Sequence, residues 1–263
     1  MEGVKTAMSI AGSDSGAGAG IQADLKTFAA FGVYGTSALT AITAQNTTGV
    51  TAVFDLPLDI ISAQIDAIIS DIGTDSVKTG MLSNTAIIEL VGSKIREHAV
   101  NNLVVDPVMV AKGGDRLLAE DAIYALRGVL IPLASVVTPN LPEASALVNR
   151  TVETVEEARK AAVDIVNMGA KSVVVKGGHL VGDAIDIFYD GKEFTEFVEK
   201  RIETSSTHGT GCTFASSIAA GLALGNSLEL SVSNAKIYVT QAIRSAIGIG
   251  NGHGPLNHFY HFG

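Results

Sequence analysis

Apolar residues along the chain follow two alternating periods, one typical of buried strands and the other of amphipathic helices. Short β-branched runs predict strands, and longer stretches with apolar residues every three or four positions predict helices. The predicted strands cover 6–11, 36–44, 77–79, 103–106, 136–138, 173–176, 184–189 and 194–199. The predicted helices cover 21–31, 59–69, 84–98, 119–129, 155–168, 211–224 and 228–247.

The order of these segments predicts an α/β fold. Buried strands separated by helices are typical of a mostly parallel sheet with helices on both faces. The last two strands meet across Asp190-Gly191, which predicts an antiparallel hairpin at a sheet edge. Thr154-Val155-Glu156-Glu157 has the pattern of a capping box at a helix start. No repeat or linker-like tract divides the chain, so we expect one domain over residues 1–263.

Composition narrows the classes of function. The 263 residues are 47% hydrophobic, yet no apolar run reaches the roughly 18 residues of a membrane-spanning helix. The N-terminus lacks the pattern of a secretory signal, so we expect a cytoplasmic protein without a membrane partner. The net charge is −9 and the basic residues are scattered, which argues against a nucleic-acid partner. The lone cysteine, Cys212, excludes an internal disulfide.

The first strand-to-helix junction is glycine-rich. Ligands of parallel sheets bind at the carboxyl ends of the strands, so these junctions are the places to look for a site. The spacing Gly18-x-Gly20-x-x-Ala23 resembles a dinucleotide-binding fingerprint, but that fingerprint needs an acidic residue about 20 positions later, and none occurs between Asp24 and Asp55. The glycines fit either a plain turn or close approach to a small substrate. Asp24 fits either a helix-dipole carboxylate or a substrate anchor.

The last major junction, Thr207-His208-Gly209-Thr210-Gly211-Cys212-Thr213, leads into a predicted helix. Its glycines let successive amides point in one direction, and the helix N-terminus adds partial positive charge, so this turn predicts an anion site. The same field is expected to lower the pKa of Cys212 and to favour a thiolate. The alternative is a small buried residue without chemistry, which is common for a free cysteine.

Three more junctions place polar residues at strand ends. Asp106 and Glu143 have the oxygen chemistry to bind Mg²⁺ directly or through water, and Asn140 and Lys176 could contact nucleotide phosphates. Each also has a simple structural explanation, as a turn residue, a first-turn carboxylate or a surface charge. Their convergence on one edge of the sheet, together with the anion turn, favours a functional site.

Two common motifs are missing, and the tail gives no clear signal. Neither Gly-x-x-x-x-Gly-Lys-Ser/Thr nor Gly-x-Ser-x-Gly occurs. A nucleotide would therefore bind without a P-loop, and the sequence argues against hydrolysis through a nucleophile elbow. His258 and His261 in the C-terminal tail are expected to lie in a solvated end of the chain.

Eight ordered motifs resemble those of the hydroxymethylpyrimidine and hydroxymethylpyrimidine phosphate kinases of thiamine biosynthesis, in the ribokinase-like superfamily. They are Ala11-Gly12-Ser13-Asp14, Gly20-Ile21-Gln22-Ala23-Asp24-Leu25-Lys26, Ala44-Gln45-Asn46-Thr47, Lys78-Thr79-Gly80-Met81-Leu82, Asp106-Pro107-Val108-Met109, Thr138-Pro139-Asn140-Leu141-Pro142-Glu143-Ala144, Lys176-Gly177-Gly178-His179 and His208-Gly209-Thr210-Gly211-Cys212-Thr213. The first glycine loop departs from the family, because Ala17 stands where a glycine is more usual. Ala17 is tolerated unless that position needs a positive φ.

The resemblance implies a three-layer ribokinase-like fold and transfer of the ATP γ-phosphate first to the hydroxymethyl aminopyrimidine and then to its monophosphate. It implies pyrimidine contacts at Gly12, Asp24, Gln45, Met81 and Val108, with the Gln45 amide facing the ring's amino and nitrogen edge. It implies ATP contacts at Asp106, Asn140, Glu143, Lys176 and Gly178, and Mg²⁺ at Asp106 and Glu143. It assigns catalysis to Cys212, Gly209, Thr210, Gly211 and Lys176, with Cys212 as the base or as a group that positions the hydroxyl.

Three alternatives or additions follow from the same comparison. A pyridoxal or pyridoxine kinase on this scaffold is the nearest alternative, and Gln45-Asn46 argues against it because the pyridoxal-directed relatives replace that amide. A non-catalytic pyrimidine- or nucleotide-sensing protein is an alternative of another class. The predicted edge hairpin at 184–199 and the habit of the family favour a homodimer.

Overall fold

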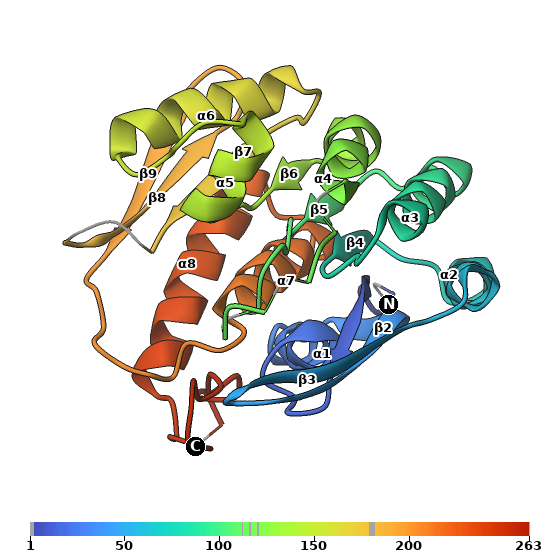
Figure 1. Cartoon of the computed structure of the whole chain (residues 1–263), viewed down its shortest axis with the longest axis horizontal. Helices are drawn as coiled ribbons and strands as arrows, with labels where there is room; N and C mark the ends of the chain where they lie inside the picture. Colours follow the sequence, from blue (N-terminus) through green and yellow to red (C-terminus); the bar gives the residue numbers. More distant parts are fainter. Residues whose placement is uncertain (1–2, 112, 116, 120, 179–181, 263) are drawn as a thin grey trace.

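The computed structural model describes residues 3–111, 113–115, 117–119, 121–178 and 182–262; His179, at the end of one motif, lies outside them. In this part of the chain one nine-stranded sheet crosses the molecule in the order β3-β2-β1-β4-β5-β6-β7-β8-β9 (Figure 1). The strands are β1 (Thr6–Asp14), β2 (Tyr34–Asn46), β3 (Gly49–Asp55), β4 (Ser76–Thr79), β5 (Leu103–Val105), β6 (Val136–Val137), β7 (Val173–Gly177), β8 (Ala184–Tyr189) and β9 (Phe194–Glu199).

The centre of the sheet is parallel and both edges are antiparallel. β2, β1, β4, β5, β6 and β7 pair in parallel, while β3 pairs antiparallel with β2, and β8 pairs antiparallel with β7 and β9. The predicted parallel sheet and the hairpin of β8 and β9 are therefore confirmed. The parallel strands bring their carboxyl ends to one edge of the sheet, which gathers the junctions into one region.

Helices cover both faces, as predicted, and each face has its own core. They are α1 (Gly20–Ala30), α2 (Leu58–Asp71), α3 (Thr85–Glu97), α4 (Ala122–Ala125), α5 (Leu141–Val148), α6 (Val155–Asn167), α7 (Thr210–Ala223) and α8 (Leu228–Arg244). Buried residues of α2 to α6 pack on one face, and those of α1, α7 and α8 pack on the other. Successive strand residues serve opposite cores, as Val104 and Val105 do, because side chains alternate along a strand. The α/β fold with three layers is confirmed.

Two elements were missing from the sequence prediction, and one was too long. β3 lies at a sheet edge and is mostly exposed, so it carries no buried alternation. α5 is short and has Pro142 in its first turn. The predicted helix 119–129 is only one α-helical turn, α4, followed by a π-helical turn (Leu126–Leu130) and a 3₁₀ turn (Ile131–Leu133). Pro132, which has no N–H for a continuing helix, ends this segment. The capping box at Thr154 is present.

The C-terminal tail packs against the molecule. Oγ1 of Thr213 in α7 lies 3.0 Å from Nε2 of His258, and the Tyr238 hydroxyl donates to the His258 carbonyl at 2.7 Å. The amide of His253 donates to the Thr47 carbonyl in the β2–β3 turn. His258 is buried, so the expectation that it is solvated is wrong, whereas His261 is exposed as expected. None of the described helices is long and apolar enough to cross a bilayer.

Candidate active site

The anion-binding turn predicted before α7 is present. Gly209 adopts φ +81°, α7 begins at Thr210, and among the described residues no side chain caps this helix. The Thr210 amide donates to the Thr207 carbonyl at 3.4 Å. The amides of Gly211 and Cys212, which have no partner within the helix, are left for solvent or a ligand. A Cβ on Gly211 would lie 3.2 Å from Nζ of Lys176 and 3.7 Å from Oδ2 of Asp106. The turn, the lysine and the carboxylate thus border one space.

The turn packs backbone to backbone against the first glycine loop. A Cβ on Gly209 would lie 1.8 Å from the carbonyl oxygen of Gly18, and a Cβ on Gly18 would lie 2.3 Å from Cδ2 of His208. Any side chain at either glycine would push the two segments apart. Ala17 in the same loop has φ +58°, so this alanine does occupy a position that favours glycine.

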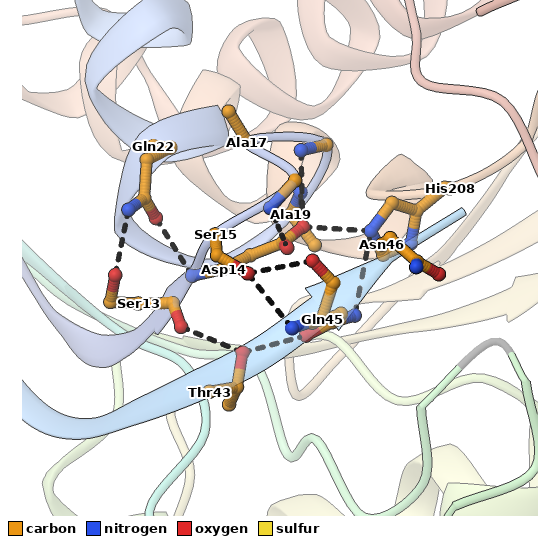
Figure 2. Close-up of polar contacts among 12 residues, drawn as sticks. Ser13, Asp14, Ser15, Ala17, Ala19, Gln22, Thr43, Gln45, Asn46 and His208 are labelled. Carbon is orange, nitrogen blue, oxygen red and sulfur yellow. Dashed lines mark hydrogen bonds and ion pairs between the residues drawn. The ribbon is translucent and has the colours of Figure 1, made fainter. Parts of the chain in front are cut away.

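Asp14 and His208 join the same two segments (Figure 2). Nε2 of His208 lies 2.8 Å from Oδ2 of Asp14, whose carboxylate also accepts the amides of Gly16, Gly18 and Ala19. Burial opposes the charge of Asp14, but the hydrogen bonds from His208 and from the amides hold its pKa below the usual value. Sequence reasoning assigned no role to this pair. The available signal was an aspartate at a buried strand end, followed by a glycine-rich turn.

Lys176 and Asp106 form the charged centre of the site. Nζ of Lys176, at the end of β7, donates to Oδ1 of Asp106 at 3.1 Å, and Oγ1 of Thr138 donates to the same oxygen at 3.3 Å. Oδ2 of Asp106 is buried and has no hydrogen-bond partner among the described residues. A buried carboxylate oxygen without a donor suits a cation ligand.

Asn140 and Glu143 lie beside this pair and also start α5. The Asn140 side chain accepts the Glu143 amide, and the Glu143 carboxylate accepts the Asn140 amide, each at 2.8 Å, which makes a capping box. Burial raises the pKa of Glu143 to about 7; Lys176 opposes this and Asp106 adds to it. Lys176 also pairs with Asn140 through a parallel β-bridge. These four residues therefore lie together, as predicted.

The thiol of Cys212 differs from the prediction. Its pKa is raised to about 11, mainly by burial, and the charges of Asp24 and Asp106 add to the shift; Lys78 and the Gly20 amide oppose it. The expected lowering by the helix N-terminus is wrong because desolvation of the thiolate outweighs the helix field. Cys212 is therefore a neutral thiol at pH 7.

Asp24 takes part in a buried ion pair beneath the site. Nζ of Lys78 lies 2.9 Å from Oδ2 of Asp24, and both side chains are fully buried. The hydroxyls of Ser9 and Ser216 donate to the same carboxylate at 2.5 and 2.6 Å. The carboxylate is thus already well supplied with donors, so a direct substrate contact would have to replace one of them. Lys78 begins one of the sequence motifs, but sequence reasoning assigned it no role.

Of the other residues predicted to contact the ligands, Gln45 lies beside the first glycine loop, while Met81, Val108 and Gly178 have other neighbours. A Cβ on Gly12 would lie 3.1 Å from Sδ of Met81, so these two are neighbours. The backbone of Gln45 exchanges hydrogen bonds with the Ser15 hydroxyl, which fixes the strand end beside the loop. Val108 follows Asp106, whose carbonyl accepts the Val108 amide. Gly178 is exposed, and its carbonyl accepts Nη1 of Arg201 at 2.7 Å.

Curated relatives match nearly the whole chain. The hydroxymethylpyrimidine/phosphomethylpyrimidine kinase of Bacillus subtilis is 48% identical, with 96% of this chain and 94% of that protein covered. The enzyme of the same name from Rhizobium meliloti is 53% identical, with 97% of each covered. A thiamine biosynthesis bifunctional protein of Geobacter sulfurreducens is 50% identical over 95% of this chain, but the chain spans only 51% of its length.

Solved structures with the same fold include kinases named for two different substrates. A Bacillus subtilis pyridoxal kinase in complex with ADP has a TM-score of 0.91 and 42% identity, with 97% of this chain and 98% of that chain covered. A phosphomethylpyrimidine kinase of Clostridium difficile has a TM-score of 0.82 and 44% identity, with 91% and 99% covered. The sequence model described as phosphomethylpyrimidine kinase matches residues 14–257, and the chain therefore belongs to the phosphomethylpyrimidine kinase family.

Proposed function

We propose that the protein is a phosphotransferase that uses ATP to phosphorylate hydroxymethyl aminopyrimidine and then its monophosphate, giving the pyrophosphate for thiamine biosynthesis. One observation carries the proposal. The uncapped α7 turn at Gly209–Cys212 borders the Lys176–Asp106 pair. Phosphoryl transfer depends mostly on positioning and on stabilising charge at the moving phosphoryl group, and this arrangement supplies both. The names of the relatives support the same activity.

Two groups of this chain, the amides of the α7 turn and the Lys176 side chain, would contact the transferred phosphoryl group. The free amides of the α7 turn would accept the charge that develops on the transferred phosphoryl group. Lys176, whose Nζ lies beside Gly211, would add a positive charge at the same place. Asn140, Glu143 and Gly178 would contact the rest of ATP.

Cys212 would orient the substrate hydroxyl more than it would act as a base. A thiol with a pKa of about 11 carries little charge at neutral pH. A loose phosphoryl-transfer transition state needs its nucleophile deprotonated only late, so a neutral group that holds the hydroxyl in line is sufficient.

Mg²⁺ fits the residues present. Oδ2 of Asp106 is buried and unpartnered in the described structure, and Glu143 is the adjacent carboxylate. These oxygens are the ligand type that Mg²⁺ prefers, bound directly or through water. When bound, the ion would neutralise charge on the ATP phosphates and orient them.

The pyrimidine would lie between Gly12, Met81, Val108 and Gln45. The Met81 side chain packs against Gly12 and would contact one face of the ring, and Gln45 would supply an amide for its polar edge. Asp24 would lie beneath the pyrimidine, because its carboxylate is held in an ion pair by Lys78.

A pyridoxal kinase activity is the second candidate, because the Bacillus subtilis pyridoxal kinase has the same fold. The Gln45 amide favours the aminopyrimidine. ADP release should be measured with hydroxymethylpyrimidine, its monophosphate, pyridoxal or no acceptor. We expect turnover with both pyrimidines, at least about 10-fold lower kcat/KM with pyridoxal, and background ADP release without an acceptor. A preference for pyridoxal would contradict the proposal, and equal ADP release without any acceptor would favour a non-kinase role.

We also propose a homodimer in the cytoplasm, with the whole chain as one domain. The β2–β3 edge is favoured over the β8–β9 hairpin as the contact, because Ile42 and Phe54 are cross-strand neighbours on one face there and both are exposed. Sedimentation of Phe54→Glu and of Val198→Glu, an exposed site on β9, tests this. Dissociation by the first substitution alone is expected. Dissociation by the second alone would assign the contact to the hairpin.

A further inference from the structure

The side-chain amide of Gln45 lies between two groups whose hydrogen-bonding roles are already fixed (Figure 2). Its Oε1 is placed 3.1 Å from Oγ1 of Thr43, and its Nε2 is placed 3.5 Å from Nε2 of His208. The two ends of an amide have nearly the same shape, so the surrounding donors and acceptors decide which end is which.

The proton on His208 is assigned by Asp14. The Asp14 carboxylate only accepts hydrogen bonds, and its Oδ2 lies 2.8 Å from Nε2 of His208. That nitrogen must therefore carry a proton. Asp14 is 2% exposed and its pKa is lowered, so it stays ionised at neutral pH and keeps this arrangement in place.

The proton on Thr43 is also committed. Its hydroxyl donates to the carbonyl of Ser13 at 2.9 Å, so Oγ1 offers a lone pair to Gln45. An amide oxygen facing Thr43 would meet this lone pair, and an amide nitrogen facing His208 would meet an N–H. Both mismatches disappear when the amide is turned by 180°, with its nitrogen toward Thr43 and its oxygen toward His208.

We propose that His208, held by Asp14, is a positioning residue that sets the orientation of the Gln45 amide and so contributes to the choice of substrate; this rests on the proposed function. Thr43 fixes the other end of the amide. One N–H and one oxygen lone pair then remain for a ligand. A ring nitrogen accepts and the adjacent amino group donates, so only one orientation of the amide matches an aminopyrimidine. The reversed amide would set donor against donor.

The test compares two acceptors, hydroxymethyl aminopyrimidine and its analogue without the amino group, by the ratio of their kcat/KM values. The variants are His208→Phe, His208→Gln, Thr43→Val and Gln45→Met. Phe keeps the ring that packs on Gly18, and Gln restores a donor to Asp14. Thr43→Val removes the lone pair that faces the other end of the Gln45 amide. It provides a second test of the proposal if His208→Phe does not fold.

We expect the wild-type protein to prefer the amino substrate by about 10- to 100-fold, the value of one or two well-made hydrogen bonds to a buried polar edge. His208→Phe, Thr43→Val and Gln45→Met should each reduce that ratio at least about 5-fold with the KM for ATP nearly unchanged, and His208→Gln should retain it within about 2-fold. A general distortion of the α7 turn would instead slow both acceptors equally.

Three results would overturn the inference. If Gln45→Met reduces the ratio while His208→Phe and Thr43→Val leave it unchanged, the amide is oriented by other groups and the proposed function stands. If Gln45→Met leaves the ratio unchanged, the pyrimidine does not contact this amide, and both the inference and that part of the proposed function fail. If neither acceptor is phosphorylated, the proposed function itself fails.

Discussion

Acid sensitivity of the fold should depend on His258, a residue of the C-terminal tail. This histidine is 3% exposed and contacts Thr213 in α7, the helix whose first turn forms the anion site. Burial lowers its pKa from 6.5 to about 4, and the charge of Lys26 adds to the shift. The perturbation is His258→Gln, which keeps a side-chain N–H near the Thr213 hydroxyl but cannot take up a proton.

The effect of His258 on the free energy of unfolding follows from the difference between its pKa values in the folded and unfolded states. Because the pKa is lower in the folded state, the unfolded chain binds this proton first as the pH falls below 6.5. The contribution of the neutral histidine is complete above pH 6.5 and is lost as the pH falls toward 4. The gap between 6.5 and about 4 corresponds to about 3 kcal/mol at pH 4 and about 2 kcal/mol at pH 5.

The assay is urea unfolding at pH 7 and at pH 5 of the wild-type protein, His258→Gln, and the control His253→Gln, which changes an exposed histidine of the same tail. Between these pH values the wild type and the control should lose about 2 kcal/mol more than His258→Gln. An equal loss in all three proteins would refute the reasoning. So would a proton titration of His258 near pH 6.5, followed by NMR in the folded protein.

Three further predictions test the site. Gly209→Ala should remove nearly all activity, because its Cβ would meet a backbone oxygen of the first glycine loop. The control is Gly225→Ala, which has a similar φ of +84° but open space around it, and it should lose only about 1 kcal/mol of stability. Equal loss of activity in both variants would show that the positive φ alone is responsible. Cys212→Ala should slow turnover and leave the KM for ATP nearly unchanged, and an unaltered kcat would remove Cys212 from the mechanism. Lys78→Met should lower the free energy of unfolding by about 3 to 5 kcal/mol, because it leaves a buried carboxylate unpaired, and replacing that carboxylate by its amide as well should recover part of the loss. A change below about 1 kcal/mol in Lys78→Met would show that the pair is not held in a dry interior.

The local pattern of apolar residues was sufficient to predict most of the strands and helices. The β-branched runs and amphipathic stretches predicted all the parallel strands, the hairpin and most of the helices, because burial on both faces imposes period and length on each segment. The exposed edge strand β3 was not predicted, since a strand with little buried surface carries no such period. The helix that became α4 was predicted too long, because a π-helical turn and a proline interrupt a pattern that otherwise continues.

The sequence by itself also determined which residue types stand at the strand ends, and hence the chemistry available to the site. The tertiary structure alone decided how those residues act on one another. It set Asp14 against His208 across 194 positions of the chain, placed Lys78 beneath Asp24, and removed enough water from Cys212 to raise its pKa. Hydrogen bonding and desolvation depend on neighbours in space, and the order of residues along a chain does not specify those neighbours until the sheet has formed.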